Sequence, residues 1–180
     1  AMWDGYAKNL NKPLCDVLGK KRDSIASYAS TPLLKSIDDY IDFVKKLQEQ
    51  NFRTIKFHTW CNIDFDLQMV SEVCPQFPNL SFMIDCEQRY SREDALKLGM
   101  ELDKLNFIWF EAPFNDFDWD SYQWLRNKIK TPVIGAGNSI LNPFEIEQSL
   151  KLDVFHHARV DATYVGGITQ MLEIMKITKK

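Results

Sequence analysis

Two kinds of hydrophobic pattern alternate along this chain, and the alternation is its most informative feature. Six short runs are rich in β-branched and aromatic residues, and some of them, such as Phe107–Phe110, are apolar at successive positions. Such continuous apolar runs are typical of strands that are buried on both faces of a sheet. We expect strands at Ile25–Ser30, Thr54–His58, Leu80–Asp85, Phe107–Glu111, Pro132–Ala136 and Val154–Asp161.

The segments between these runs carry a helical period instead. In the first of them, Ile37, Tyr40, Ile41, Val44 and Leu47 recur at the spacing that places them on one helix face. The same reasoning predicts helices at Ser36–Gln50, Phe65–Cys74, Arg92–Leu105, Trp119–Lys128, Pro143–Leu150 and from Ile168 to the end of the chain.

Strands that alternate with helices indicate parallel strands joined by helical crossovers. Two architectures satisfy this pattern, a doubly wound open sheet and a closed barrel. The chain contains neither a GxGxxG motif nor a P-loop, which weakens the nucleotide-binding version of the open sheet. We therefore predict an α/β fold of the (β/α)8 TIM-type barrel, with about six βα units present in this chain.

The first 23 residues do not follow the alternation. Residues 1–10 have a helical pattern, residues 11–19 indicate a turn and a short helix, and residues 20–23 form a charged connector. We interpret residues 1–23 as the tail of a preceding domain with its connector, and residues 24–180 as an incomplete barrel domain.

Composition narrows the possible partners. The net charge of −3 provides no basic surface for nucleic acid, and no apolar run is long enough for a membrane span. The N-terminus lacks a signal-peptide pattern, and Cys15, Cys61, Cys74 and Cys86 are scattered without a CxxC pair. We expect reduced thiols in a cytoplasmic protein with no nucleic-acid or membrane partner.

Polar residues lie at the ends of the predicted strands. Active sites of barrels of this kind lie at the carboxyl ends of the strands. The second run ends with Lys56 and His58, which are two residues apart and so point to the same side. The third, fourth and sixth runs end with Asp85, Glu111 and Asp161. We expect these five ionisable groups to converge on one mouth of the barrel.

At these positions the chain resembles the enolase superfamily, and within it the mandelate racemase and muconate lactonising group. Lys56-Phe57-His58 stands where the family has Lys-x-Lys, and the opening segment resembles the end of the family's capping domain. The other matching motifs, in chain order, are Ile84-Asp85, Trp109–Pro113 (the family's F-E-x-P), Thr131–Gly135, and Val160-Asp161 followed by Val165–Thr169.

The resemblance implies a shared partial reaction. A Mg²⁺ ion held by three carboxylates binds the substrate carboxylate, a base removes the proton α to it, and the metal and a nearby cation stabilise the enediolate. It also implies the following roles: Asp85 and Glu111 as metal ligands, Asn138 as a candidate third ligand, His58 as base, Lys56 as electrophilic cation, and Asp161 as the residue that orients a His on the next strand.

The chain departs from the family pattern at the third metal ligand. Gly137 stands where the family has Glu, with Asn138 beside it, and Glu87 stands where an Asn commonly follows the first ligand. Two carboxylates hold Mg²⁺ less tightly than three, so we expect Mg²⁺ to bind weakly or not at all. A Gly137→Glu substitution is then expected to raise the affinity.

These observations favour an acid-sugar dehydratase, or a racemase or epimerase of hydroxy acids, acting on a small carboxylate or sugar acid. The alternative is a catalytically impaired or non-catalytic homologue that acts as a binding protein. A third interpretation is a sugar-phosphate enzyme on a similar barrel. Its glycine-rich phosphate loop would follow the last strands of the barrel, which this sequence does not contain. Because an incomplete barrel exposes unpaired strand edges, we also expect a homo-oligomer.

Overall fold

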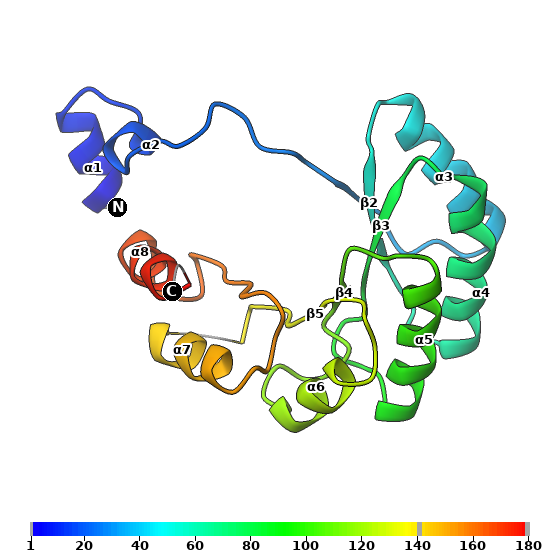
Figure 1. The fold of residues 1–180 in the computed structure, drawn as a ribbon. Helices are drawn as coiled ribbons and strands as arrows, with labels where there is room; N and C mark the ends of the chain where they lie inside the picture. The colour runs from blue at the N-terminus through cyan, green and yellow to red at the C-terminus, as the bar shows by residue number, and fades with distance from the viewer. Residues whose placement is uncertain (1, 140–141, 179–180) are drawn as a thin grey trace.

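Five parallel strands form a single sheet in the computed structural model, which describes residues 2–139 and 142–178. Their order across the sheet is their order along the chain. They are β1 (Ala29–Ser30), β2 (Thr54–His58), β3 (Ser81–Asp85), β4 (Phe110–Glu111) and β5 (Val133–Ile134). A doubly wound sheet reverses its strand order at a switch point, so this order favours the barrel. Figure 1 shows the strands along the inner side of an arc, with the helices outside.

Helices follow the strands as the hydrophobic period predicts, with ends that differ from the predicted ones by at most two residues over the described part of the chain. Ala1, Lys179 and Lys180, which belong to the predicted terminal helices, lie outside the described residues. The helices are α1 (Met2–Asn9), α2 (Leu14–Val17), α3 (Ile37–Glu49), α4 (Ile63–Val73), α5 (Arg92–Lys104), α6 (Trp119–Arg126), α7 (Pro143–Lys151) and α8 (Ile168–Ile177), and a 3₁₀ turn at Cys74–Gln76 follows α4.

Side-chain caps determine where most of these helices begin. Ser36 forms a capping box with Asp39 at the start of α3. Asn62, Ser91 and Asn142 each accept a hydrogen bond from a backbone N–H of the first turn of their helices. These short polar side chains satisfy N–H groups that have no partner inside the helix.

The main core lies between the sheet and the helices on its outer face. Phe57 of β2 stacks on Phe82 of β3, with ring centroids 5.3 Å apart, and packs edge-on against Tyr40 of α3. All three rings are buried. Because side chains alternate along a strand, residues that neighbour Phe57, such as Lys56 and His58, point to the opposite face of the sheet. That inner face carries the candidate site.

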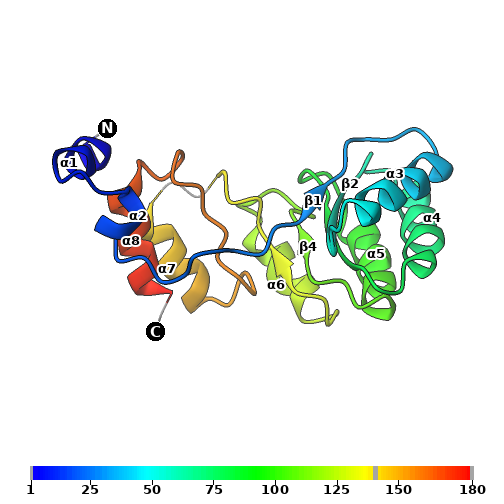
Figure 2. The same cartoon turned by 90° about the horizontal axis from the view of Figure 1, so that it is seen from above.

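The N-terminal helices do not join the sheet. A long extended connector separates α2 from β1, and α1 and α2 lie beside α8 (Figure 2). The indole N–H of Trp3 in α1 donates a hydrogen bond of 2.9 Å to Thr169 Oγ1 in α8. Among the described residues, no helix combines the length and the apolar character needed to cross a membrane.

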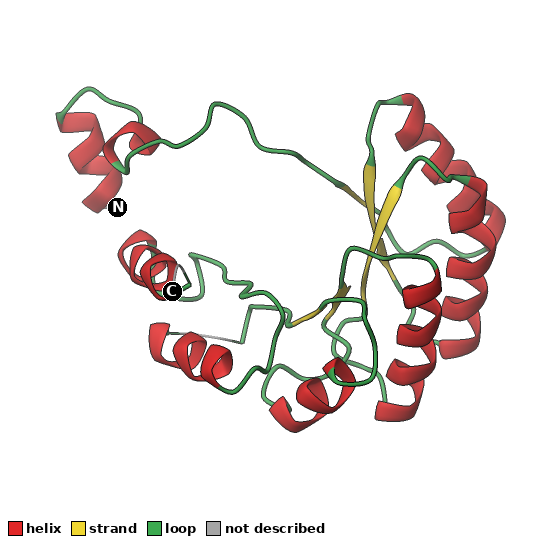
Figure 3. Cartoon of the chain, viewed as in Figure 1, coloured by secondary structure: helices red, strands yellow, loops and turns green. Residues whose placement is uncertain are grey.

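Four of the predicted strands differ from the structure. The runs at Phe107–Glu111 and Pro132–Ala136 form shorter strands than predicted, β4 and β5, of two residues each. The run at Ile25–Ser30 pairs only through Ala29 and Ser30, and Ile25 is 79% exposed in the connector. The run at Val154–Asp161 was predicted as a sixth strand, and this prediction is wrong: the stretch is a loop in Figure 3. It keeps one backbone bond to β5, from His156 N to Val133 O at 3.0 Å.

The side chain of His156 explains why no ladder forms there. Its Nδ1 accepts a hydrogen bond of 2.9 Å from the backbone N–H of Val133, a donor that a neighbouring strand would otherwise pair with a carbonyl group. A side chain therefore replaces a rung of the ladder, and the segment continues past β5 in an irregular conformation. This course brings Arg159 to the mouth of the sheet.

Candidate functional site

The strand register places three candidate residues in one row. His58 of β2 is paired with Asp85 of β3, which is paired in turn with Glu111 of β4. Residues that are paired across parallel strands point to the same face of the sheet, so the three side chains lie next to one another at the carboxyl ends of their strands. Lys56 lies two residues before His58 and points to the same face.

Lys56 joins the two carboxylates of this row. Its Nζ lies 2.8 Å from Asp85 Oδ2 and 3.1 Å from Glu111 Oε2. The side chains of Lys56 and Glu111 are only 6% and 1% exposed, so these ion pairs are shielded from water. His58 Nε2 approaches the same oxygen, Asp85 Oδ2, at 3.4 Å.

The other nitrogen of His58 is held by the backbone. Nδ1 lies 2.9 Å from Thr31 O, a carbonyl oxygen that can only accept, so Nδ1 carries a proton in this arrangement. Nδ1 also lies 3.2 Å from the hydroxyl of Ser30. The ring is thereby oriented with Nε2 facing the carboxylates, and Nε2 is the nitrogen that can exchange a proton with a ligand in the mouth.

The close packing of these groups shifts their pKa values in opposite directions. Burial alone would raise the pKa of Asp85, but the hydrogen bonds from His58 and Lys56 outweigh it and hold that pKa well below its usual range. Burial and the adjacent Asp85 charge raise the pKa of Glu111 against the opposing effect of Lys56. The hydrogen bond with Asp85 raises the pKa of His58. Of the two carboxyl groups, Asp85 is therefore the one that more readily stays ionised.

Arg159 is a fifth ionisable member of the cluster, and it was not among the residues predicted from the sequence. Its Nη1 lies 3.0 Å from Glu111 Oε1, so the two oxygens of Glu111 face Arg159 and Lys56 respectively. The arginine lies on the segment after His156, two residues before Asp161. In a strand these two positions share a face, and that spacing was the available signal.

Arg159 also fills the space beside Gly137. Gly137 has a φ of +75°, and a Cβ added to it would lie 2.5 Å from the backbone oxygen of Arg159 and 3.0 Å from its Cγ. A side chain at position 137 is therefore opposed both by backbone conformation and by contact. The expectation that Gly137→Glu strengthens metal binding is at odds with this geometry, because the carboxylate cannot be added without displacing Arg159.

Asp116 fixes the loop that follows β5. Its two carboxylate oxygens accept hydrogen bonds from the backbone N–H groups of Ala136 and Gly137, at 2.8 and 3.1 Å. Asp116 is 1% exposed and also lies 3.4 Å from the hydroxyl of Tyr122. The role of Asp116 could not be predicted from the sequence, since an aspartate in a loop carries no signal of its distant partners.

The structure does not bring the remaining two candidates into the hydrogen-bonded cluster. Asn138 is exposed and its Oδ1 lies 3.5 Å from Gln88 Nε2. Asp161 is exposed and accepts a hydrogen bond from the backbone N–H of Thr163 at 2.6 Å, which contributes to a lowered pKa of its carboxyl group. Both line cavities beside the cluster, and their proposed roles remain predictions.

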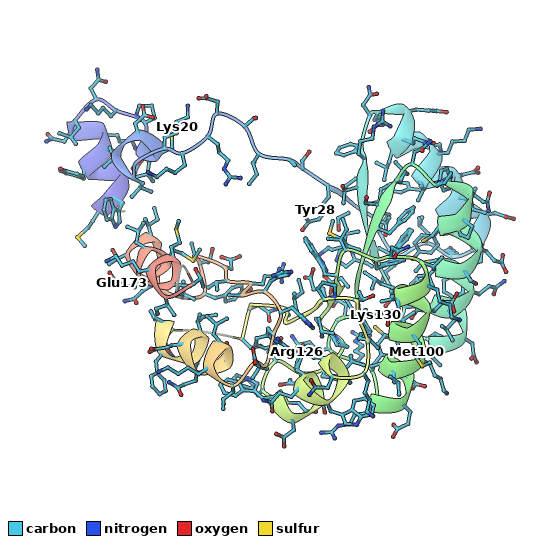
Figure 4. The ribbon with its side chains drawn as sticks, viewed as in Figure 1. Lys20, Tyr28, Met100, Arg126, Lys130 and Glu173 are labelled. Carbon is cyan, nitrogen blue, oxygen red and sulfur yellow. The ribbon has the colours of Figure 1, made fainter. Side chains whose placement is uncertain are left out.

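Two adjoining cavities open at this mouth. The smaller, of about 180 Å³, is bordered by Asp85 and Glu111, and the larger, of about 430 Å³, is bordered by Asp161 and Tyr164. Ala136, Asn138 and Arg159 line both cavities. On the other side of the cluster, the ring of Tyr28, labelled in Figure 4 at the end of the connector, lies 5.8 Å from Lys56 Nζ.

The comparison with known families identifies the fold and its relatives. Residues 39–180 match the family model described as "Enolase C-terminal domain-like". The chain belongs to the enolase superfamily. Its relatives lie in the mandelate racemase and muconate lactonising group, as the strand-end motifs predict. The predicted fold, a partial (β/α)8 barrel, is confirmed by the parallel sheet and by the barrel enzymes that it resembles.

The solved structures and the curated relatives that this chain resembles are enzymes of the enolase superfamily. A putative mandelate racemase/muconate lactonizing enzyme from Pseudovibrio sp. is 32% identical with a TM-score of 0.94, and covers 98% of this chain and 48% of its own. D-glucarate dehydratase from Agrobacterium tumefaciens, complexed with magnesium, is 30% identical with a TM-score of 0.93, covering 99% and 50%. The o-succinylbenzoate synthase of Listeria innocua is 29% identical over 97% of this chain and 46% of its own.

The chain thus spans about half the length of the relatives it matches. They include acid-sugar dehydratases, o-succinylbenzoate synthases and amino-acid epimerases of the enolase superfamily. Their variety shows a common scaffold with several reactions.

The magnesium site of this group is not reproduced by the residues present. Both carboxylates of the pair are already occupied by cations, Lys56 on Asp85 and Glu111, and Arg159 on Glu111. Gly137 stands where the sequence resemblance leads us to expect the third carboxylate, and there the Arg159 backbone opposes a side chain. Over residues 2–139 and 142–178, no group of three or more His, Cys, Asp and Glu side chains is placed to hold a metal ion. These residues do not fit a three-carboxylate magnesium centre.

Proposed function

We propose that this mouth binds a small carboxylic acid of the sugar-acid class and that His58 removes the proton α to its carboxylate. The observation that carries the proposal is the convergence of Lys56, His58, Asp85 and Glu111 on the inner face of the sheet. Membership of the enolase superfamily supports it, because dehydratases of sugar acids are among the relatives.

The proposed chemistry assigns one task to each side chain. In the neutral form of His58, Nδ1 keeps its proton against Thr31 O and Nε2 is free to accept the α proton. The electron pair left on the α carbon then passes into the carboxylate to give an enediolate. Lys56, held protonated by Asp85 and Glu111, stabilises the negative charge that develops on the carboxylate oxygens. The proton on His58 then has two possible destinations. If a proton returns to the α carbon, the α hydrogen is exchanged with solvent or the acid is epimerised. If the proton is transferred to a β-hydroxyl group, that group leaves as water and the electron pair of the enediolate forms the new double bond.

No step of this proposal passes through magnesium, since the donor set does not fit the ion. We expect magnesium to bind weakly to this chain, because two carboxylates that are already paired offer little to a divalent cation. We also propose the homo-oligomeric state and the capping role of residues 1–23 that the sequence suggested.

Exchange of the α proton with solvent tests the proposal directly. The chain is incubated in D₂O with galactarate, glucarate and tartrate, and loss of the α-proton signal is followed by ¹H NMR. We expect exchange with at least one acid, and a loss of at least about 100-fold in its rate in His58→Asn. His157→Asn, an exposed histidine next to His156, is the matched control and should keep the rate.

A second candidate function is binding of the same acids without turnover. The occupation of both carboxylates by cations and the glycine at position 137 favour it. Binding of an acid without any α-proton exchange would support this second function and contradict the first.

A further inference from the structure

We propose that the Arg159 guanidinium is the group that anchors the ligand carboxylate in this site, and that this binding needs no metal ion. The inference rests on the proposed function, since it names how the acid is held. It starts from the disagreement between this donor set and the magnesium centre of the relatives, and from what stands in the centre's place.

The first step is the route of the chain. The segment after His156 leaves the sheet and passes against Gly137, so close that its backbone oxygen lies 2.5 Å from where a Cβ of residue 137 would be. The Arg159 stem lies over the same glycine, with Cγ 3.0 Å from that point. The glycine therefore admits the arginine, and the two positions together replace a carboxylate with a cation.

The second step is the geometry of the guanidinium. One of its nitrogens, Nη1, is paired with Glu111, which is buried and holds it in place. Within the described residues, this ion pair is the only hydrogen bond or ion pair of the Arg159 side chain. A guanidinium has five N–H donors arranged in a planar fork, so most of them remain available to a ligand.

The third step is access. The Arg159 side chain is 44% exposed, whereas the Lys56 side chain, between the two carboxylates, is only 6% exposed. Arg159 borders both cavities of the mouth, and the larger of them, about 430 Å³, is of the size that takes a small organic ligand. Arg159 is thus an exposed cation at this opening, and its free edge suits bidentate binding of a carboxylate.

The fourth step is charge. Within the cluster, Asp85 and Glu111 are balanced by Lys56 and Arg159. Glu87 and Asp161 add negative charge to the linings of the two cavities, so an acid needs a cation there to bind. Arg159 is the basic residue that lines both cavities, and its free donors are therefore placed to bind an incoming carboxylate. The positive charge that a metal ion would provide is here part of the polypeptide.

The experiment measures binding of galactarate by isothermal titration calorimetry, once in EDTA and once in excess Mg²⁺. We expect the same affinity in the two buffers. Arg159→Gln should weaken binding at least tenfold in EDTA, and Arg159→Lys, which keeps the charge but loses the fork, should give an intermediate loss. Arg22→Gln, which removes an exposed arginine of the connector, is the control for loss of charge and should bind normally.

Circular dichroism and thermal unfolding establish that each variant is folded, and Arg159→Lys provides a second measurement if Arg159→Gln is not. Binding that requires Mg²⁺, or that is unchanged in both Arg159 variants, overturns the inference. The absence of binding in either buffer overturns it as well. The deuterium-exchange assay with His58→Asn decides the proposed function separately, because acid binding that depends on Arg159 but shows no α-proton exchange contradicts the reaction and supports the anchor.

Discussion

The two halves of this sheet are held together in different ways. From β2 to β4 the strands pair in register, with five paired positions between β2 and β3. Their buried apolar side chains belong to one core cluster with those of helices α3, α4 and α5. From β5 onwards, side chains satisfy much of the backbone. Asp103 accepts from the N–H groups of Lys130 and Thr131, Asp116 from those after β5, and His156 from that of Val133.

The difference shows what each arrangement can do. A ladder of backbone bonds with a buried face is regular, so it places residues in rows, and the row of His58, Asp85 and Glu111 is a direct result. Side-chain bonds to the backbone allow the chain to leave the sheet, and the same irregular half brings Arg159 against Glu111. The site therefore combines residues from the regularly paired strands with Arg159, which lies on a loop that leaves the sheet.

The largest effect should come from the regular half. Phe57→Ala removes a fully buried ring that stacks on Phe82 and packs against Tyr40, and we expect a loss of about 3 to 5 kcal/mol in the free energy of unfolding, measured with urea. Met100→Ala, at an exposed position of α5 that is labelled in Figure 4, should change it by less than about 0.5 kcal/mol. Similar losses in the two variants would mean that the core does not lie where the structure places it.

The irregular half should be most sensitive to a single carboxylate. Asp116→Ala leaves the N–H groups of Ala136 and Gly137 without their partner, and we expect a loss of about 2 to 4 kcal/mol. Asp120→Ala, an exposed aspartate of the nearby helix α6, is the control and should be nearly neutral. If Asp116→Ala unfolds like the control, the loop after β5 is held by something other than this side chain.

The regular half contains one buried acid whose titration should be measurable. Burial raises the pKa of Asp66 from 3.8 to about 6, against the effect of the hydrogen bond from Tyr90. Because the folded state then binds the proton more tightly than the unfolded state, the contribution of Asp66 is fully present below about pH 4. It is lost as the pH rises through about 6.

The expected change is a fall of about 2 to 3 kcal/mol in the free energy of unfolding over that range. Comparison of urea unfolding curves at several pH values for the native chain and for Asp66→Asn isolates this contribution. A pH profile that is the same in both chains would show that the Asp66 carboxyl titrates normally.

Lys56 and Arg159 show which parts of the site can be predicted from the sequence and which cannot. The side of the sheet that Lys56 and His58 face follows from strand alternation, which depends only on local residue order. The proximity of the residues at the ends of β2, β3 and β4 follows once these strands are known to be parallel and consecutive. The ion pair of Arg159 with Glu111 could not be predicted in this way. Arg159 lies in a run that was predicted as a strand, and that strand does not form because the imidazole of His156 accepts the hydrogen bond of the Val133 N–H.

Gly137 shows a second limit. By its place in the family motif, Gly137 stands where a glutamate is expected. This suggests that Gly137→Glu would restore the missing carboxylate. The positive φ and the Arg159 backbone beside it are properties of the fold, and no pattern in the residues around position 137 encodes them. For the same reason Asp116 could not be assigned, because its partners lie some twenty residues away on another element.

The sequential order of the strands also bears on how the site assembles during synthesis. Each strand pairs with the one made just before it, so the sheet can grow as the chain leaves the ribosome without waiting for a distant partner. Lys56, Asp85 and Glu111 can meet once β4 has emerged, while Arg159 follows roughly 2 to 10 s later at ordinary rates of translation. During that interval Lys56 and His58 face the two carboxylates without Arg159, so the arginine is the last member of the cluster to be added.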